Sequence, residues 1–156
     1  MRTFLSQQPR VWYIGSPPEL LASISGHAAS QLIPDIEQAI ADYPYPDTYE
    51  AWPGPNSNTF VAWVIRRVPG LDVNLPNTAI GKDYLGNDYL AQTPSGVGYQ
   101  LSAGGYFGIL AGVREGLELN VLGLSLGVDP RHLAIKLPGI GSLGLLNPWP
   151  QISPAP

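Results

Sequence analysis

Cysteine is absent from this chain of 156 residues. Its absence excludes a disulfide framework, a thiolate nucleophile and any metal site built on cysteine ligands. Histidine is almost as scarce, because only His27 and His132 are present and neither has a metal-ligating residue three or four positions downstream. We therefore predict no histidine-based zinc site and no other metal site.

Charge is also scarce. Charged residues make up 13% of the chain, about half of the usual quarter. The eight basic residues are scattered, and with twelve acidic residues the net charge is -4. This balance argues against nucleic acid as a partner. Apolar residues still reach 44%, which argues against disorder and favours one folded domain that is rich in loops, since 18 glycines and 17 prolines are present.

Long apolar runs are missing as well. The first residues, MRTFLSQQPR, have no apolar segment of the kind that a signal peptide needs, so we expect the chain as given to be cytoplasmic. The longest uncharged run, Tyr89 to Val113, is interrupted by Gly, Ser, Gln, Thr and Pro. We therefore predict that the chain contains no membrane span.

The N-terminal third carries two helical patterns. In SPPELLASI, Ser16 is a predicted N-cap, Pro17 occupies the first helical position and Glu19 completes a capping box, with Gly26 expected to end the helix. The second pattern is ASQLIPDIEQAIADY, in which Pro34 belongs to the first turn or kinks the helix. Its apolar residues lie on one stripe: Leu32, Ile33, Ile36, Ile40 and Tyr43.

A third helix is expected after WPGPNSNTF. The apolar series Phe60, Val61, Val64, Ile65 and Val68 has the spacing of an amphipathic helix, and Pro69-Gly70 ends it. TYEAW, residues 48–52, alternates like a short strand. Residues 73–90 are irregular, with one short helical turn expected near Thr78 to Tyr84.

From Gly96 onward the apolar residues recur at every second position, which predicts strands. Arg114-Glu115-Gly116 is typical of a hairpin turn, and the apolar phase slips at Leu122-Gly123, which indicates a bulge or a tight bend. Helices followed by strands predict an α+β fold, with N-terminal helices and one central amphipathic helix packed on a C-terminal antiparallel sheet. We place an extension at residues 1–15, the domain at 16–146 and a Pro-rich tail at 147–156. The strands are expected at 99–103, 107–113, 117–121, 124–128, 132–137 and 141–146.

GIGSLG, residues 139–144, matches the glycine spacing of dinucleotide-binding turns. That site needs a helix directly after the glycines, and Pro148 and Pro150 forbid one. A Gly-rich bend between edge strands explains the motif better, and we predict no cofactor.

The polar run of Asn56, Ser57, Asn58 and Thr59 has two interpretations. Asn and Ser are favoured N-caps, so the run starts the third helix. One cap needs one residue, however, and a helix start also stabilises anions and activated nucleophiles. Ser57 and Thr59 are therefore candidate nucleophiles, Asn56 and Asn58 are candidate ligand-binding amides, and His132 is the candidate base.

Charged residues in two loops are weaker candidates. Lys82, Asp83 and Tyr84 lie together in TAIGKDYL and are candidate ligand-binding residues. The alternative is a solvated loop tip or a local ion pair. Glu115 and Glu118 flank a turn, and alternation places them on opposite faces unless the turn twists, so they do not predict a glycosidase.

Several motifs together resemble a bacterial domain-of-unknown-function family, number 3750. They are YEAWPGPNSNTFVAWVIRRVP, LPNTAIGKDYL, TPSGVGYQLS, GLELNVLGLSLGVD and LAIKLPGIG. The resemblance implies no activity, but members often carry an upstream membrane segment and an upstream histidine, which implies an association with the membrane. The arrangement is also similar, as a loose analogy, to permuted papain-like amidases and acyltransferases. These keep a cysteine at a helix start, where this chain has Asn56 to Thr59.

Two functions follow as hypotheses. The first is a non-catalytic binding or structural module of an envelope-associated protein, with an unknown small molecule or envelope component as its partner. The second is an amide or ester hydrolase or acyltransferase that uses Ser57 or Thr59 with His132 or another base. The apolar strands from Tyr99 to Leu126 could also face a partner or a lipid, in which case an exposed apolar patch is expected there.

Overall fold

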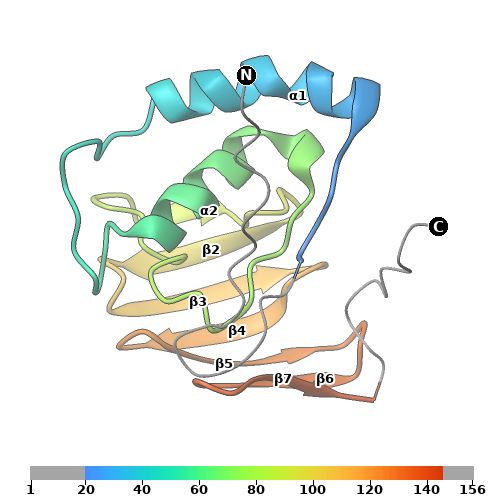
Figure 1. The fold of residues 1–156 in the computed structure, drawn as a ribbon. Helices are drawn as coiled ribbons and strands as arrows, with labels where there is room; N and C mark the ends of the chain where they lie inside the picture. The colour runs from blue at the N-terminus through green and yellow to red at the C-terminus, as the bar shows by residue number, and fades with distance from the viewer. Residues whose placement is uncertain (1–19, 146–156) are drawn as a thin grey trace.

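The computed structural model describes residues 20–145. Two helices, α1 (Gly26–Ala41) and α2 (Ser57–Arg67), precede a short 3-10 helix, η2 (Pro69–Leu71), and a seven-stranded sheet. Figure 1 shows three layers, in which α1 lies on α2 and α2 lies over the sheet. This is the predicted α+β architecture, with the helices N-terminal to the sheet. The strands are β1 (Leu90–Gln92), β2 (Gly98–Ala103), β3 (Phe107–Gly112), β4 (Gly116–Val121), β5 (Leu124–Asp129), β6 (Ala134–Leu137) and β7 (Gly141–Gly144).

Helix α1 corresponds to the second helical pattern, with Pro34 inside it. The prediction that Gly26 ends an earlier helix is wrong, because Gly26 begins α1 and residues 20–25 are not helical. In this non-helical segment Leu21 packs against the cluster around Ala62 and Ile65, so a tertiary contact outweighs the local helix signals. The predicted cap at Ser16 to Glu19 lies outside the described residues, as do the extension 1–15 and the tail 147–156.

Helix α2 confirms the third pattern. Its face toward α1 buries Val64 and Val68, which pack with Ala39 of α1. Trp63 joins the two helices by donating its indole N–H to the carbonyl oxygen of Ala39, at 2.9 Å. Arg67 lies over the Trp63 ring, with 3.7 Å between its guanidinium carbon and the ring centroid.

Two local predictions fail. TYEAW is not a strand: residues 48–52 form an irregular loop, which the hydrogen bond from Glu50 N to Pro55 O closes at 2.8 Å. Residues 78–84 form successive turns in place of a helical turn, with i to i+3 bonds at Lys82 and Tyr84. Both segments lie against the start of α2, and their contacts with it replace regular backbone pairing.

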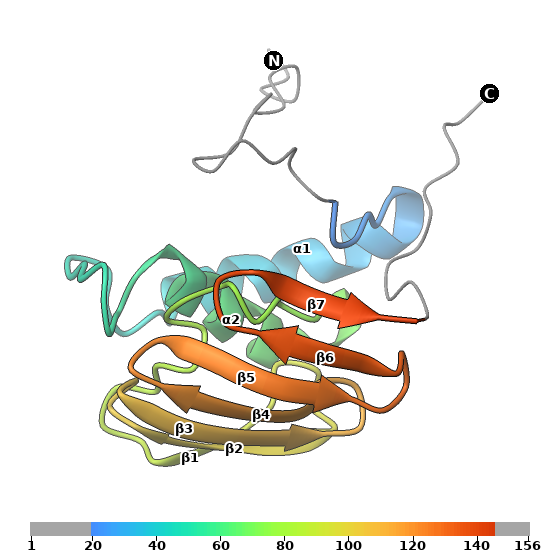
Figure 2. The ribbon, with the colours of Figure 1, turned by 90° about the horizontal axis from the view of Figure 1, so that it is seen from below.

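The strands form one antiparallel meander in the order β1-β2-β3-β4-β5-β6-β7. The expected turn at 114–116 and the expected bend at Leu122-Gly123 join β3 to β4 and β4 to β5. Leu122 and Gly123 both have positive φ, which a tight two-residue connection requires. Figure 2 shows the strands in chain order, with β7 at one edge of the sheet.

The two faces of this sheet differ in an unusual way. The face toward α2, here called the inner face, buries polar side chains: Gln100, Ser102, Glu118, Asn120, Ser125 and Lys136. The opposite face, here called the outer face, carries the apolar residues, which are about half exposed. The apolar core lies instead between the helices and the loop after η2, around Ala62, Ile65, Leu75 and Ala79.

Candidate functional site

The start of α2 is built on Asn56, its N-cap. The Asn56 side-chain oxygen accepts hydrogen bonds from the backbone N–H groups of Asn58 and Thr59, at 2.9 and 3.1 Å. Its amide group donates to the carbonyl oxygens of Ala51 and Ile80, at 2.9 and 3.1 Å. Asn56 therefore caps the helix and also ties it to two loops, using both ends of its side chain.

Thr59 completes the cap. Its hydroxyl accepts from the backbone N–H of Asn56 at 3.1 Å, which closes a capping box, and donates to the carbonyl oxygen of Gly81 at 2.8 Å. Gly81 has φ +92, and a Cβ there would collide with the Asn56 side chain, so only glycine allows this approach. Since the Thr59 side chain is buried and bonded, its role here is structural.

Asn58 and Ser57 complete the polar run in different ways. The Asn58 amide donates to the Ile80 carbonyl oxygen at 2.8 Å, so it strengthens the same clamp on the loop. Ser57 is exposed at the first position of α2, and within residues 20–145 its hydroxyl has no hydrogen-bond partner. The run therefore divides into three structural residues and one free hydroxyl.

The structure does not bring Ser57 or Thr59 together with His132. The start of α2 lies by the β4–β5 turn, because a Cβ at Gly123 would touch both Trp52 and Ile80. His132 follows Asp129, at the far end of β5. A strand of six residues spans roughly 20 Å, so the imidazole lies at the opposite end of the sheet from the hydroxyl groups.

His132 pairs with Asp129, with 2.7 Å between Nδ1 and Oδ2. Burial would raise the pKa of Asp129, but the hydrogen bond and charge of His132 and the backbone N–H groups of Arg131 and His132 outweigh it. The pKa of Asp129 is therefore held below its ordinary value.

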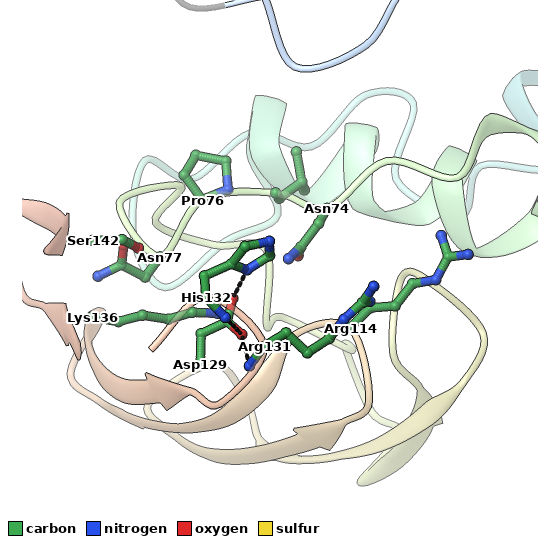
Figure 3. Close-up of a pocket in the computed structure, with 10 residues that line it drawn as sticks. Asn74, Pro76, Asn77, Arg114, Asp129, Arg131, His132, Lys136 and Ser142 are labelled. Atoms are coloured by element: carbon green, nitrogen blue, oxygen red, sulfur yellow. Dashed lines mark hydrogen bonds and ion pairs between the residues drawn. The ribbon is translucent and has the colours of Figure 1, made fainter. Parts of the chain in front are cut away.

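A pocket of about 180 Å³ surrounds this pair. Figure 3 shows it between the loop that carries Asn74 and Asn77 and the β5–β6 turn. Two of its cations already have anionic partners, since Arg114 pairs with Asp72 and Lys136 pairs with Glu118. Within the described residues no group of three or more His, Cys, Asp or Glu side chains is arranged to hold a metal ion.

Lys82 and Asp83 form a local ion pair, which is one of the two alternatives to ligand binding, and the other alternative, a solvated loop tip, does not apply. Both are buried, at 3% and 5% exposure, between the loop and the inner face of the sheet. Lys82 Nζ lies 3.0 Å from Asp83 Oδ1 and 2.7 Å from Glu118 Oε2. Burial opposes the charged form, but the two carboxylates outweigh it, so the pKa of Lys82 is raised. Tyr84 packs edge-on against Tyr45, with ring centroids 5.9 Å apart.

The pair belongs to a larger ionic cluster on the inner face. Glu118 also binds Lys136, whose ammonium group donates to the backbone oxygen of Glu115. Glu115 and Glu118 are both buried on the inner-face side of the sheet. Glu115 lies in the turn before β4, so the alternation of side chains along the strand does not apply to it. Its Oε1 accepts from the Ser95 backbone N–H at 2.9 Å.

Arg66 connects the cluster to α2. Its guanidinium donates to the Lys82 carbonyl oxygen and to Gln100 Oε1, both at 2.9 Å. Burial lowers the pKa of Arg66 to about 10, against the opposing charges of Asp83 and Glu115. The cluster holds three cations, Arg66, Lys82 and Lys136, and three carboxylates, Asp83, Glu115 and Glu118, so it is neutral overall. Among the described residues Glu115 Oε2 is buried without a hydrogen-bond partner, but the other charged groups of the cluster are bonded, so we interpret the cluster as a structural core.

The outer face is an accessible surface of one chemical kind that extends over all the strands of the sheet. The strand registers align its side chains in three rows across the sheet. Within β1 to β7 none of the residues on this face is charged. The rows are Leu90-Leu101-Ile109-Leu119-Leu126, Tyr99-Ala111-Leu117-Val128-Ile135-Leu143 and Ala103-Phe107-Val121-Leu124.

The exposed apolar patch expected between Tyr99 and Leu126 is therefore present. Its centre, Leu119, is 48% exposed, and Ile109 and Leu126 beside it are 49% exposed. The sequence signal for this patch was the alternation of apolar and polar residues in β4, which placed Glu118 and Asn120 on one face of the strand and the leucines on the other. Alternation separates the two faces of a strand but does not say which face is covered.

Comparison with known proteins concerns mainly the helical half of the chain. The family described as "Protein of unknown function (DUF3750)" matches residues 2–84, which include α1, α2 and the loop with Lys82 and Asp83. No curated protein and no solved structure matches the chain. The match covers more than half of the sequence and agrees with the resemblance carried by the GPNSNTF and LPNTAIGKDYL motifs. The chain belongs to the DUF3750 family of proteins of unknown function.

Proposed function

We propose that this chain is a non-catalytic binding module whose working surface is the outer face of the sheet. The observation that carries the proposal is the separation of chemistry between the two faces. Glu118, Asn120 and Lys136 are buried and hydrogen-bonded, while most of the apolar residues of the strands are exposed. Proteins rarely leave a continuous apolar surface in water unless a partner covers it.

The size of the surface supports this proposal. The three rows all cross β3, β4 and β5, so the apolar area is continuous. Exposed apolar residues also flank it in the turns, such as Tyr106, Leu122 and Leu133. A shallow groove across β2, β3 and β4 lies on this face, lined by Leu101, Phe107, Ile109 and Leu119. We place the module in association with the bacterial envelope, on the basis of the family resemblance alone.

The hydrolase hypothesis has less support. Thr59 uses its hydroxyl in the helix cap, and the His132 imidazole lies at the other end of the sheet. Ser57 has an exposed hydroxyl at a helix start, without a hydrogen-bond partner among residues 20–145, but a nucleophile also needs a base within hydrogen-bond reach. In the part of the chain that the structure describes, His132 is not placed to act as that base.

None of the helices within residues 20–145 has the length and apolar character that a membrane span requires.

Binding of the apolar dye bis-ANS tests the proposal. We expect the folded protein to enhance the dye fluorescence, and Ile109→Lys to reduce the enhancement severalfold. The control is Ile33→Lys on α1, since Ile33 is 50% exposed and Ile109 is 49% exposed. Far-UV circular dichroism must show that each variant is folded, because dyes also bind partly unfolded states. An equal loss in both variants, or no enhancement with the wild type at a concentration at which it is monomeric, would contradict the proposal.

A further inference from the structure

We propose that the partner covering the outer face is a second copy of this chain, so that two sheets pack face to face. This inference rests on the proposed function and names the partner for the same surface. It makes the assembly a two-sheet sandwich with the helices of each copy on its outer sides. Aligned sheet packing of this kind brings two sheets to about 10 Å from each other, with apolar side chains interdigitating between them.

The area is adequate for such a dimer. Strands β2 to β5 are each about 20 Å long and the shorter β6 is about 13 Å long, so at a spacing of about 4.8 Å they give a footprint of roughly 450 Å². Two copies together then bury roughly 900 Å² from these strands, and the turns and the edge strands bring the total to the lower limit of about 1,000 Å² for a specific interface. The exposed apolar residues of the turns, among them Val113 and Leu122, extend this area.

The chemistry of the face matches a copy of itself. A twofold interface brings the same patch of both copies together, so like charges on the patch would repel one another. The outer-face residues of β1 to β7 include no charged side chain, so this repulsion does not arise. The charged residues of β4 and β6, Glu118 and Lys136, point to the inner face and pair there.

A lipid surface fits the same face less well. Peripheral binding to anionic membranes uses clusters of Lys and Arg around the apolar residues. Here the net charge is -4, and three of the eight basic residues are directed into the ionic cluster, namely Arg66, Lys82 and Lys136. Because the face is uncharged and the net charge of the chain is negative, an uncharged apolar protein surface is a better partner for it than an anionic membrane.

The geometry also indicates where the contact is centred. Leu119 lies on the middle strand of the meander and at the middle of β4, between Ile109 and Leu126 of the neighbouring strands. In a symmetric dimer the residue nearest the twofold axis meets its own counterpart. We therefore place Leu119 close to the axis, with the edges of the sheet at the rim.

Analytical ultracentrifugation of the full chain over a wide concentration range is the primary test. We expect the wild-type mass to rise from monomer to dimer and no further. Leu119→Lys should weaken the dimer about a hundredfold, because each dimer then buries two lysines in place of two leucines. Ile33→Lys serves as the control and should associate like the wild type. If Leu119→Lys fails to fold by circular dichroism, Leu126→Lys in the next strand repeats the test.

A second measurement uses the absence of cysteine from the chain. Leu119→Cys gives each chain a single thiol. A short bis-maleimide can then join the thiols of two chains whose sheets pack face to face. We expect covalent dimers for Leu119→Cys and almost none for Ile33→Cys on the opposite side of the molecule.

The outcomes separate this inference from the proposed function. A wild type that stays monomeric but binds bis-ANS at the outer face would overturn the dimer and leave the binding surface in place. A dimer that persists in Leu119→Lys would also overturn the inference and would point to pairing of the sheet edges. Growth beyond the dimer, or binding of monomers to vesicles of anionic phospholipid, would overturn it as well. Failure of the dye to bind at concentrations where ultracentrifugation shows a monomer would remove both proposals together.

Discussion

At the scale of single residues, Asn56 is the most connected part of the candidate site. Its side chain caps α2 and holds the loops at Ala51 and Ile80. Asn58 and Thr59 fix the same loop at Ile80 and Gly81. This explains why a cap that needs one residue is followed by further polar ones: they position the loop that carries Lys82 and Asp83.

Asn56→Ala tests this role through stability. Loss of an N-cap costs about 1 kcal/mol, the Ala51 carbonyl oxygen would lose its donor and the Ile80 carbonyl oxygen would keep only Asn58, so we expect a total of about 2–3 kcal/mol. Ser57→Ala is the matched control and should change stability by less than about 0.5 kcal/mol, since it removes an exposed hydroxyl. Urea denaturation followed by circular dichroism measures both. Equal effects would show that Asn56 is only an ordinary polar residue.

Labelling with a fluorophosphonate probe tests the alternative function at Ser57. We expect no labelling above background in either the wild type or Ser57→Ala, because His132 does not lie within reach of the hydroxyl. Trypsin under the same conditions controls for the probe. Labelling of the wild type that Ser57→Ala abolishes would instead support a hydrolase.

Asp129 predicts a pH dependence of stability. Its pKa in the folded state lies below the ordinary value of 3.8, so its ionised form is stabilised by folding. Near neutral pH this contribution is fully present, and it is lost as the pH falls below 3.8 through the folded pKa. Asp129→Asn should therefore be less stable than the wild type near neutral pH, with the difference shrinking in acid. Urea unfolding at several pH values measures this, and a constant difference would contradict it.

At the scale of elements, β4 shows how one strand serves two environments. Glu118 and Asn120 point to the inner face, where they bind Lys82, Lys136 and Asp83. Leu117, Leu119 and Val121 point to the outer face. The same strand therefore contributes to the ionic cluster on one face and to the apolar surface on the other. Substitutions can alter the side chains of one face without altering those of the other.

A pair of substitutions in β4 and β6 tests the ionic cluster. Glu118→Leu leaves Lys82 and Lys136 buried with too few anions, and removing one partner of a buried ion pair costs about 3–5 kcal/mol. Adding Lys136→Met removes the excess cation, so the double variant should recover a large part of this loss. Chemical denaturation of the wild type, both single variants and the double variant completes the cycle. Strict additivity would show that the two residues do not interact.

At the scale of the whole molecule, the sheet is covered on one side and open on the other. The apolar core lies between α1, α2 and the loop after η2, and the sheet adds only Leu110 and Ala134 to the buried apolar residues. The inner face is held to this core by the ionic cluster and by Arg66 of α2. The outer face is left as the surface for a partner.

Neighbouring residues of β3 test this orientation. Ile109 is 49% exposed on the outer face, and Leu110 is 4% exposed on the inner face. Ile109→Lys should cost less than about 1 kcal/mol in the monomer, while Leu110→Lys buries an unpaired charge and should cost more than about 4 kcal/mol or prevent folding. Thermal and urea unfolding at low protein concentration compare the two variants. The reverse order would mean that the apolar face is the covered one.

Local patterns in the sequence predicted much of the fold. The spacing of Val64, Ile65 and Val68 indicated α2, and alternation together with the turn at 114–116 indicated β3 and β4. These signals are local, because they depend on the period of one element. The helix expected before Gly26 and the strand at 48–52 failed because contacts with α2 and its core decided those segments.

The candidate site was only partly visible in the sequence. The capping role of Asn56 could be predicted, since it depends on neighbours within a few residues. The burial of Lys82, Asp83 and Glu118 could not, because these residues are up to 36 positions apart and meet only when the loop folds over the sheet.

The sequence by itself determined the class of fold, the start of α2 and the separation of polar and apolar residues along each strand. Only the tertiary structure decided which face of the sheet is covered. The period of a strand distinguishes its two faces but assigns neither to the interior. The buried Lys82 and Lys136 reach the carboxylates of Asp83 and Glu118 only when the polar face turns toward α2, and these ion pairs favour that orientation.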